Sequence, residues 1–259
     1  MRRAVRVTAC VAVALVTGCG SAAAQPSTTA TASAHALSGS LTVLAAASLT
    51  EAFNDAKPAL EAGNPGFTVT YSFAGSQQLV TNVLDGAPAD VIATADQITM
   101  QKLVTAGLVD TPRVFAHNRL EIAVAPGNPK GIHTLSDLAR SDVSVVLANP
   151  SIPAGNFAHQ VLTRAGVSVT PKSLELDVKT VLEKVASGDA DAAIVYATDV
   201  AASNQVAGVV IPDSQNIIAA YPIAVVKASQ NSASGQAFVT QVMSGSIHTA
   251  LLRRGFLPL

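Results

Sequence analysis

The sequence predicts an α/β protein with largely parallel sheets, and two observations support this fold class. Short apolar runs typical of buried strands alternate with segments of helical period that are long enough to return the chain to the same edge of a sheet. A glycine also follows several of the helical segments, where a left-handed residue ends a helix, at Gly86, Gly107, Gly166 and Gly188.

The expected elements begin near residue 40. Strands are predicted at residues 41–46, 68–73, 91–93, 121–125, 144–148, 192–195, 209–211 and 223–226. Helices are predicted at residues 48–61, 76–85, 96–106, 136–140, 154–165, 178–187, 198–203, 232–243 and 247–253. Ser48 with Glu51 matches a capping box for the first helix, and Pro58 inside it predicts a kink or an early break.

The first 18 residues are typical of a secretory signal peptide. Three arginines lie within residues 1–6, and a short apolar stretch ending in small residues follows them. The segment LVTGC places Cys19 after Val16, Thr17 and Gly18, and it resembles the lipobox of bacterial lipoproteins. That resemblance implies cleavage before Cys19 and acylation of its thiol. The alternative is an ordinary signal peptide with a chance cysteine.

Residues 19–39 are rich in Ala, Ser and Thr and carry almost no charge, so they are predicted to be a flexible tether. The only other cysteine, Cys10, lies in the removed segment, which leaves no partner for a disulfide or a thiol metal site. Removing the three signal-peptide arginines takes the formal net charge from −1 to about −4. This mildly acidic balance argues against nucleic acid as a partner.

Five junctions between a strand and the next helix share small or hydroxyl-bearing residues. A helix N-terminus carries unpaired N–H groups and a partial positive charge, and both favour anions. Small side chains leave those amides accessible, and hydroxyl groups add donors. Each junction alone is explained by capping or packing, so only their convergence would make an anion site. The candidate residues are Ser48, Ser76, Ala154, Val178 and Tyr196.

The local signals at these junctions differ. Ser76 follows Gly75 and is expected to cap its helix, whereas Pro153 suits a first helical turn and leaves the amides of Ala154 and Gly155 uncovered. Asp177 is the expected cap of the helix that begins at Val178. If the Glu51 carboxylate binds the amide of Ser48, that amide is lost to a ligand.

The segments VLAAASLTEAF, YSFAGSQQL, GAPADVIATAD, NPSIPAGNFA and AIVYATDV resemble those of the periplasmic molybdate-binding proteins of bacterial ABC transporters, in order and in spacing. The resemblance runs from about Leu41 to the C-terminal RRGF. It implies the two-lobed fold of type II periplasmic binding proteins, in which each lobe is a mostly parallel sheet flanked by helices and the ligand cleft lies between the lobes.

Position by position, the resemblance implies that molybdate or tungstate is bound by uncharged donors. Ser48 and Ser76 would contribute from lobe 1, and Ala154, Val178 and Tyr196 from lobe 2. Lobe 1 would comprise residues 40–117 and 222–259, and lobe 2 residues 118–221. Gly75 stands where a serine often occurs in the family, and Pro222 fits an edge or hinge position better than a central strand.

The function expected from these residues is that of an extracytoplasmic lipoprotein that captures molybdate, or tungstate, and delivers it to an ABC permease with its ATPase. It would be a monomer that needs no cofactor and touches the membrane only through Cys19. A receptor of the same fold for another small anion is the alternative, although no arginine for a carboxylate lies at the five junctions.

Two further alternatives have weaker support. A secreted serine hydrolase would need a Gly-x-Ser-x-Gly elbow, and neither Ser48 nor Ser76 lies in one, so we expect no enzyme. The five histidines, at positions 35, 117, 133, 159 and 248, are scattered, and no cluster of ligands at metal-binding spacing occurs in the sequence. A receptor for a metal cation is therefore not favoured.

Overall fold

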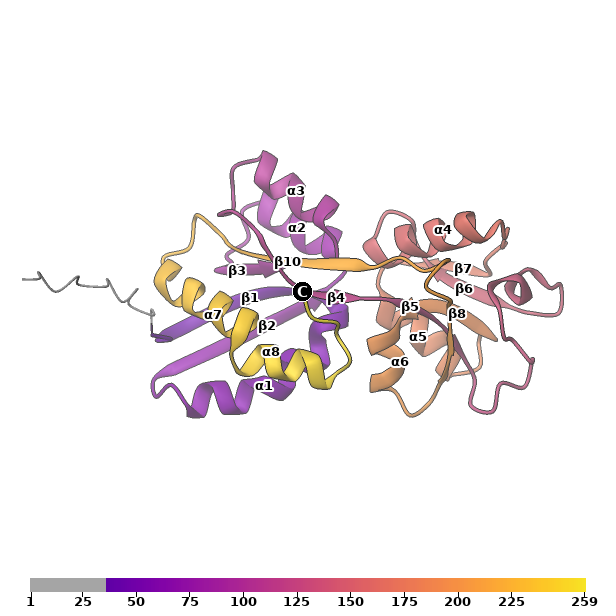
Figure 1. The fold of residues 1–259 in the computed structure, drawn as a ribbon. Helices are drawn as coiled ribbons and strands as arrows, with labels where there is room; N and C mark the ends of the chain where they lie inside the picture. Colours follow the sequence, from indigo (N-terminus) through magenta and orange to yellow (C-terminus); the bar gives the residue numbers. More distant parts are fainter. Residues whose placement is uncertain (1–35) are drawn as a thin grey trace, which may run out of the picture. The chain divides into compact units, whose positions relative to one another are not determined.

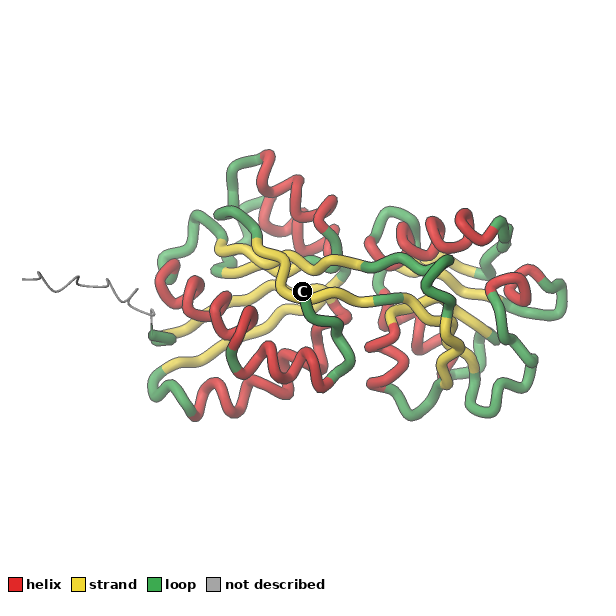
Figure 2. The backbone as a smooth tube through the Cα atoms, in the orientation of Figure 1, coloured by secondary structure: helices red, strands yellow, loops and turns green. Residues whose placement is uncertain are grey.

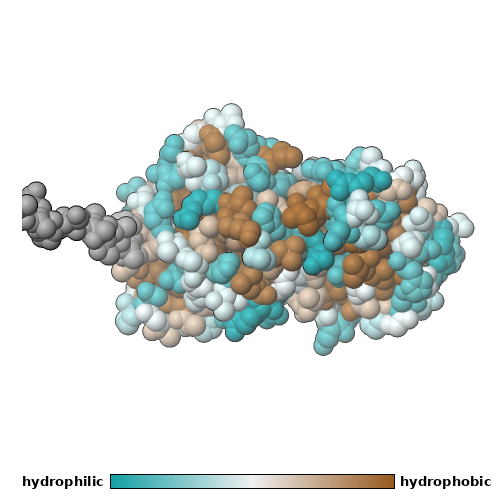
Figure 3. Space-filling view, viewed as in Figure 1, coloured by the Kyte–Doolittle hydropathy of each residue, from teal (hydrophilic) through white to brown (hydrophobic). Residues whose placement is uncertain are grey.

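The computed structural model describes residues 36–259, which form two five-stranded sheets with helices on their faces (Figures 1 and 2). The predicted signal peptide, Cys19 and all but the last residues of the predicted tether lie outside the described residues. Among residues 36–259, no helix is long and apolar enough to cross a membrane. Figure 3 shows hydrophobic residues scattered between hydrophilic ones on one face of the molecule.

The first sheet has the strand order β2-β1-β3-β10-β4. Its strands are β1 (Gly39–Ala46), β2 (Phe67–Ala74), β3 (Val91–Ala93), β4 (Arg113–Asn118) and β10 (Ala219–Val225). The 3-10 turn η1 (Ala47–Leu49) follows β1 directly. The helices of this sheet are α1 (Thr50–Ala62), α2 (Ser76–Leu84), α3 (Gln97–Thr105), α7 (Ser232–Ser244) and α8 (Ser246–Arg253). We call this sheet and its helices the first lobe.

Alternate residues of the first sheet pack into two separate hydrophobic clusters. Val43 and Val91 belong to the cluster that contains Phe53 of α1, whereas Leu44 and Ile92 belong to the cluster formed with α2 and α3. Figure 1 shows the same two layers, with α2 and α3 on one side of the sheet and α1, α7 and α8 on the other. Burial on both faces explains why the interior strands β1 and β3 are largely apolar.

The second sheet has the strand order β7-β6-β8-β5-β9. Its strands are β5 (Leu120–Val124), β6 (Val145–Ala148), β7 (Ser173–Glu175), β8 (Ala192–Tyr196) and β9 (Ala207–Val210). Its helical segments are η2 (Leu135–Ala139), α4 (Pro153–Ala165), α5 (Val178–Ala186) and α6 (Ala197–Ala202). We call this sheet and its helices the second lobe.

Both sheets are mixed, which differs from the mostly parallel sheets expected. In the first, β1 pairs parallel with β2 and β3, while β10 pairs antiparallel with β3 and β4. In the second, β6 pairs parallel with β7 and β8, and β5 pairs antiparallel with β8 and β9. The antiparallel pairs arise because β4 leads the chain out of the first lobe and β10 leads it back beside β4.

The crossing strands also refine the expected lobe limits. Asn118 is still part of β4, and the chain re-enters the first sheet at Ala219, which pairs with Asn118, rather than at Pro222. Pro222 lies inside β10, a central strand, against the expectation of an edge or hinge position. The register of β10 against β4 shifts between Tyr221 and Pro222, and such a bulge accommodates a residue without an N–H group.

Local signals predicted most other elements, with three differences. Strands β4 and β7 were not predicted, because β4 mixes polar and apolar residues and β7 has three residues. The first helix starts at Thr50 and continues through Pro58 to Ala62 without the early break, since Phe53 and Leu60 on either side of the proline are anchored in the core. The four glycines expected to end helices all have positive φ.

Candidate functional site

One small hollow is lined by all five residues singled out at the helix starts. The residues of its wall are Ala46, Ala47, Ser48, Ala74, Gly75, Ser76, Ala95, Ile152, Pro153, Ala154, Val178 and Tyr196, and none of these carries a charge. Both lobes contribute to it. Its cavity volume is about 20 Å³, against the ~300–1,000 Å³ of typical pockets for organic ligands. The hollow therefore suits a group of few atoms.

Three helices begin at the hollow: α2 at Ser76, α4 at Pro153 and α5 at Val178. The N–H groups of a first helical turn have no intrahelical acceptor, so these ends present unpaired donors and partial positive charge. The predicted cap of α5 is confirmed, since Oδ1 of Asp177 accepts the N–H of Thr180 at 2.9 Å. Pro153 occupies the first turn of α4, also as predicted.

Gly155 follows Ala154 and has a packing role of its own. Ala154 lines the hollow, but Gly155 is absent from the wall. A Cβ atom at Gly155 would lie 2.0 Å from the carbonyl oxygen of Asn149. The missing side chain therefore lets α4 pack closely against the loop before it.

Ser76 is the first residue of α2 and not its cap, which is Gly75. The buried Oγ of Ser76 accepts the backbone N–H of Ala95 at 3.0 Å. A hydroxyl oxygen that accepts in this way keeps its own proton for another acceptor, so Ser76 can donate into the hollow. A Cβ atom at Gly75 would lie 2.7 Å from the carbonyl oxygen of Leu176, so glycine allows the two lobes to approach here.

The capping box expected from Ser48 and Glu51 is not formed. Ser48 lies in η1, and α1 begins only at Thr50 without a side-chain cap. The Ser48 Oγ lies 3.0 Å from the hydroxyl oxygen of Tyr221. Glu51 instead accepts a hydrogen bond from Nζ of Lys179 at 2.8 Å. Attraction to this ammonium group explains why the carboxylate leaves the Ser48 amide free.

Tyr196 ends β8 with its side chain buried, and its hydroxyl has no hydrogen-bond partner among the described residues. Its ring packs edge-to-face against that of Tyr221, with ring centroids 5.8 Å apart. Burial, followed by the proximity of Tyr221, raises the pKa of Tyr196 well above its ordinary value, so the hydroxyl keeps its proton. A buried O–H group that lines the hollow and lacks an acceptor is a ready donor for a ligand oxygen.

Three polar residues behind Ser48 were missed by the sequence reasoning. Asn118, Thr198 and Tyr221 are all buried. The amide Nδ2 of Asn118 donates to Oγ1 of Thr198 at 2.8 Å and to the hydroxyl oxygen of Tyr221 at 3.5 Å. Asn118 and Tyr221 do lie at the expected limits of lobe 2, residues 118–221, but nothing in the sequence there says which side chains turn inward.

Charged residues lie beside the hollow and form what we call the ion cluster, which consists of Glu51, Lys179 and Asp199. Nζ of Lys179 lies 2.8 Å from Oε2 of Glu51 and 2.9 Å from Oδ1 of Asp199. The Asp199 carboxylate is fully buried, and Lys179 is its charged partner. Burial raises the pKa of Asp199, and the lysine opposes this shift.

Lys179 is held by this cluster and is not part of the wall of the hollow. Burial acts to lower the pKa of Lys179, but Asp199 and Glu51 together raise it above its ordinary value, so the side chain remains an ammonium ion. It lines a neighbouring depression with Thr50, Phe73 and Asp177. Among residues 36–259, no group of three or more His, Cys, Asp or Glu is placed to hold a metal ion.

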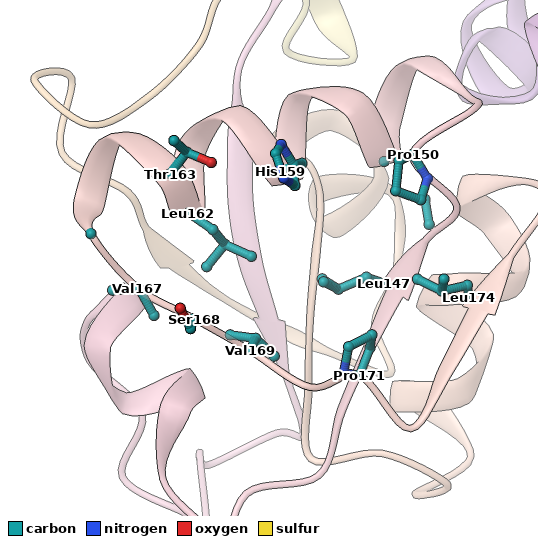
Figure 4. Close-up of a pocket in the computed structure, with 13 residues that line it drawn as sticks. Leu147, Pro150, His159, Leu162, Thr163, Val167, Ser168, Val169, Pro171 and Leu174 are labelled. Carbon is teal, nitrogen blue, oxygen red and sulfur yellow. The ribbon is translucent and has the colours of Figure 1, made fainter.

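A larger cavity of about 590 Å³ lies in the second lobe, between α4 and the chain that follows it (Figure 4). Leu162, Val167 and Val169 point into it, and His159 and Thr163 lie along α4 at its rim. None of the five predicted residues lines this cavity. Its apolar wall lacks the converging helix starts of the hollow, so the hollow remains the candidate site.

Two α/β lobes joined by crossing strands, with helix starts from both lobes at one hollow, define the fold of a type II periplasmic binding protein. The family model described as bacterial extracellular solute-binding protein matches residues 41–257. This chain belongs to that family.

Individual relatives agree with this assignment. The chain is 39% identical over 219 residues to the molybdate-binding protein ModA of Mycobacterium tuberculosis H37Rv, covering 84% of each chain. It is similar to the substrate-binding domain of a putative molybdenum ABC transporter from Clostridium difficile, with a TM-score of 0.66 and 26% identity over 86% of this chain and all of that one. The periplasmic molybdate-binding protein of Azotobacter vinelandii shares the fold, with a TM-score of 0.74 and 19% identity over 85% and 99% of the two chains.

Proposed function

We propose that this protein captures molybdate, or the nearly isosteric tungstate, outside the cytoplasm and delivers it to an ABC permease for uptake. The observation that carries the proposal is the meeting of Ser48, Ser76, Ala154, Val178 and Tyr196, from five separate segments that follow or end a strand, at one small uncharged hollow. The relatives named as molybdate-binding proteins support the same ligand. These relatives are binding proteins, and the chain is one too, rather than an enzyme.

Neutral donors suffice for such an ion. Molybdate is a tetrahedral dianion without a proton at neutral pH, and burying it without partners would be prohibitive. Amides at three helix starts and the hydroxyls of Ser48, Ser76 and Tyr196 can replace its hydration shell. Each charge-assisted hydrogen bond contributes on the order of 1.5–3 kcal/mol, so a few of them exceed the cost of ordering the ion.

Selectivity follows from protons and from size. Phosphate near neutral pH keeps at least one proton, which needs an acceptor that a site made of donors does not offer. Sulfate carries no proton, so it must be rejected because it is smaller and is held loosely in a cavity that fits molybdate. A receptor for another small oxyanion is therefore the competing function, and sulfate is its strongest candidate.

The proposal extends to the parts of the chain outside the described residues. Residues 1–18 would be removed as a signal peptide, and acylated Cys19 would anchor the protein through a tether of residues 19–39. The two lobes would comprise residues 40–117 with 222–259 and residues 118–221, apart from the small shifts at the crossings. The protein would act as a monomer, and molybdate would be its ligand rather than a resident cofactor.

A thermal-shift panel tests the proposed function. The chain from residue 36 onward is heated with equal concentrations of molybdate, tungstate, sulfate or phosphate. A ligand that binds only the native state stabilises it by RT ln(1 + [L]/Kd), about 2.7 kcal/mol at a concentration of 100 Kd, and therefore raises the melting temperature. We expect large shifts with molybdate and tungstate, and little or none with phosphate. A shift with sulfate that equals the molybdate shift would reject the assignment.

A further inference from the structure

A buried hydrogen-bonded chain reaches Ser48 from the crossing between the lobes. Asn118 lies at the end of β4, immediately before the chain enters the second lobe, and Tyr221 lies on the returning strand β10. Asn118 is 1% exposed and Tyr221 is fully buried. The chain runs from Asn118 to the hydroxyl of Tyr221 at 3.5 Å, and from there to Oγ of Ser48 at 3.0 Å.

The orientation of the Asn118 amide is set at the far end of this chain. The backbone N–H of Arg119 donates to Oδ1 of Asn118 at 2.9 Å, and an N–H group can only donate. This contact sets the orientation of the amide, so its NH₂ group must face the other way. Its two protons then have two acceptors, Oγ1 of Thr198 and the hydroxyl oxygen of Tyr221.

The same reasoning continues to the hollow. With the Asn118 amide donating to the Tyr221 oxygen, the proton of Tyr221 can be donated to Oγ of Ser48, 3.0 Å away, and we assign it there. Burial raises the pKa of Tyr221 above its ordinary value, so the proton stays on the phenol at neutral pH. Ser48 is then an acceptor toward Tyr221, and its own proton is free to point into the hollow that it lines.

Ser76 also accepts a hydrogen bond from the protein, because its Oγ accepts the N–H of Ala95. Both serines of the hollow therefore have a lone pair occupied by a donor from the protein. A hydroxyl without such a donor has both lone pairs open and accepts a proton of the ligand more readily. We propose that Tyr221, oriented by Asn118, is a positioning residue that holds Ser48 as a donor and so enforces selectivity against protonated oxyanions.

This inference rests on the proposed function, and it predicts a change in selectivity that a loss of packing would not cause. Replacing Tyr221 with Phe removes the donor to Ser48 while keeping the ring. We expect the affinity for molybdate to fall about 5- to 30-fold. The affinity for phosphate should fall less or rise, because Ser48 can now accept a phosphate proton. The ratio of the two affinities should therefore drop at least threefold.

The experiment measures both Kd values by calorimetry for the wild type, Tyr221→Phe, Ser48→Ala and the double variant. Tyr71→Phe is the matched control in the first lobe, since it also deletes a buried phenol oxygen, but one that has no hydrogen-bond partner within residues 36–259. In the Ser48→Ala background, Tyr221→Phe should no longer change the ratio. If Tyr221→Phe lowers the melting temperature strongly, Asn118→Ala supplies a second test, and it should lower the ratio of molybdate to phosphate affinity in the same direction.

The outcomes separate the two proposals. If the wild type binds molybdate and Tyr221→Phe weakens both anions equally, or leaves both unchanged, the positioning role is rejected while the proposed function stands. The role is also rejected if the change in ratio persists in the Ser48→Ala background. If the wild type binds none of the oxyanions, the proposed function fails, and the inference fails with it.

Discussion

The hollow and the ion cluster occupy the same three chain segments but handle charge in opposite ways. Each residue of the cluster follows a residue of the hollow by one to three positions, in the pairs Ser48 and Glu51, Val178 and Lys179, and Tyr196 and Asp199. The hollow has only neutral groups in its wall, and its hydroxyls lack protein acceptors or receive protein donors. The cluster satisfies its charges internally, with an ammonium ion between two carboxylates.

The difference indicates what each region contributes. A lysine in the hollow would attract any anion, including phosphate, whereas fixed neutral donors distinguish anions by proton content and size. Moving the lysine a short distance away keeps the ligand free of a counter-ion. The charge then serves a contact between the lobes, because Glu51 belongs to α1 of the first lobe and Lys179 to α5 of the second.

The largest expected effect comes from alkaline pH, which removes protons from the tyrosines and so lowers the free energy of unfolding. The chain has three tyrosines, and burial raises the pKa of Tyr71, Tyr196 and Tyr221 above the ordinary value. Below pH ~10, folded and unfolded chains both hold these protons, and their full contribution to stability is present. Above it, only the unfolded chain releases them. The free energy of unfolding should then fall by up to ~1.4 kcal/mol per pH unit for each tyrosine.

Urea unfolding between about pH 9 and 11, together with tyrosinate absorbance, measures this slope. Tyrosinate absorbance should appear with unfolding and not before it. Tyr71→Phe should reduce the slope by about one third, because one of the three groups is gone. Titration of all three tyrosines in a chain that stays folded and equally stable would contradict the buried, neutral character of the site.

A carboxylate placed in the hollow is the second test. Ser76→Asp would set a negative charge against the bound dianion in a site with no cation in its wall. Juxtaposed like charges cost several kcal/mol, so molybdate affinity should fall at least ~100-fold. Ser76→Ala, which removes one donor without adding charge, should cost only about 1–3 kcal/mol. Equal calorimetric affinities of the two variants would show that Ser76 does not face the ligand.

Removal of a single neutral donor should have a smaller effect. Tyr196→Phe and Ser48→Ala should each weaken molybdate binding by about 1–3 kcal/mol and leave the fold intact. Their effects on the ligand-free protein should differ. The Tyr196 hydroxyl has no partner among the described residues, so its removal should not lower the melting temperature, whereas Ser48→Ala leaves the buried hydroxyl of Tyr221 without its acceptor. A clear loss of ligand-free stability in Tyr196→Phe would contradict this description of its hydroxyl.

Much of the site could be predicted because its residues carry local signals. Small residues, proline and an Asx cap mark helix starts in the sequence itself, and these starts led to Ser76, Ala154 and Val178. The polar residues behind Ser48 could not be found in this way. Whether Asn118 and Tyr221 turn toward Ser48 depends on the pairing of β4 with β10, which joins residues about a hundred positions apart.

The errors near the first helix have the same origin. Ser-x-x-Glu is a local capping signal, but Glu51 is attracted by Lys179, which lies 128 positions further along the chain. The bulge that accommodates Pro222 in a central strand likewise depends on a distant neighbour, β4. Local propensity therefore located the helix starts. Contacts between distant segments determined the hydrogen-bond partners of Glu51, Asn118 and Tyr221.

The smallest predicted effect tests the role of the ion cluster between the lobes. Glu51→Gln removes the charge that Lys179 meets across the lobes, while Asp199 still pairs with the lysine, so no ammonium ion is left alone. Solvent-accessible ion pairs contribute about 0.2–1 kcal/mol, and this pair is partly exposed, so molybdate should dissociate at most about fivefold faster. Stopped-flow release should show this difference at low salt and lose it at high salt, because screening weakens the pair in the wild type. Asp142→Asn is the matched control, since it breaks the 2.9 Å pair with Arg140 inside the second lobe. An equal change in that control, or a change that persists at high salt, would place the effect of Glu51 elsewhere than in the contact between the lobes.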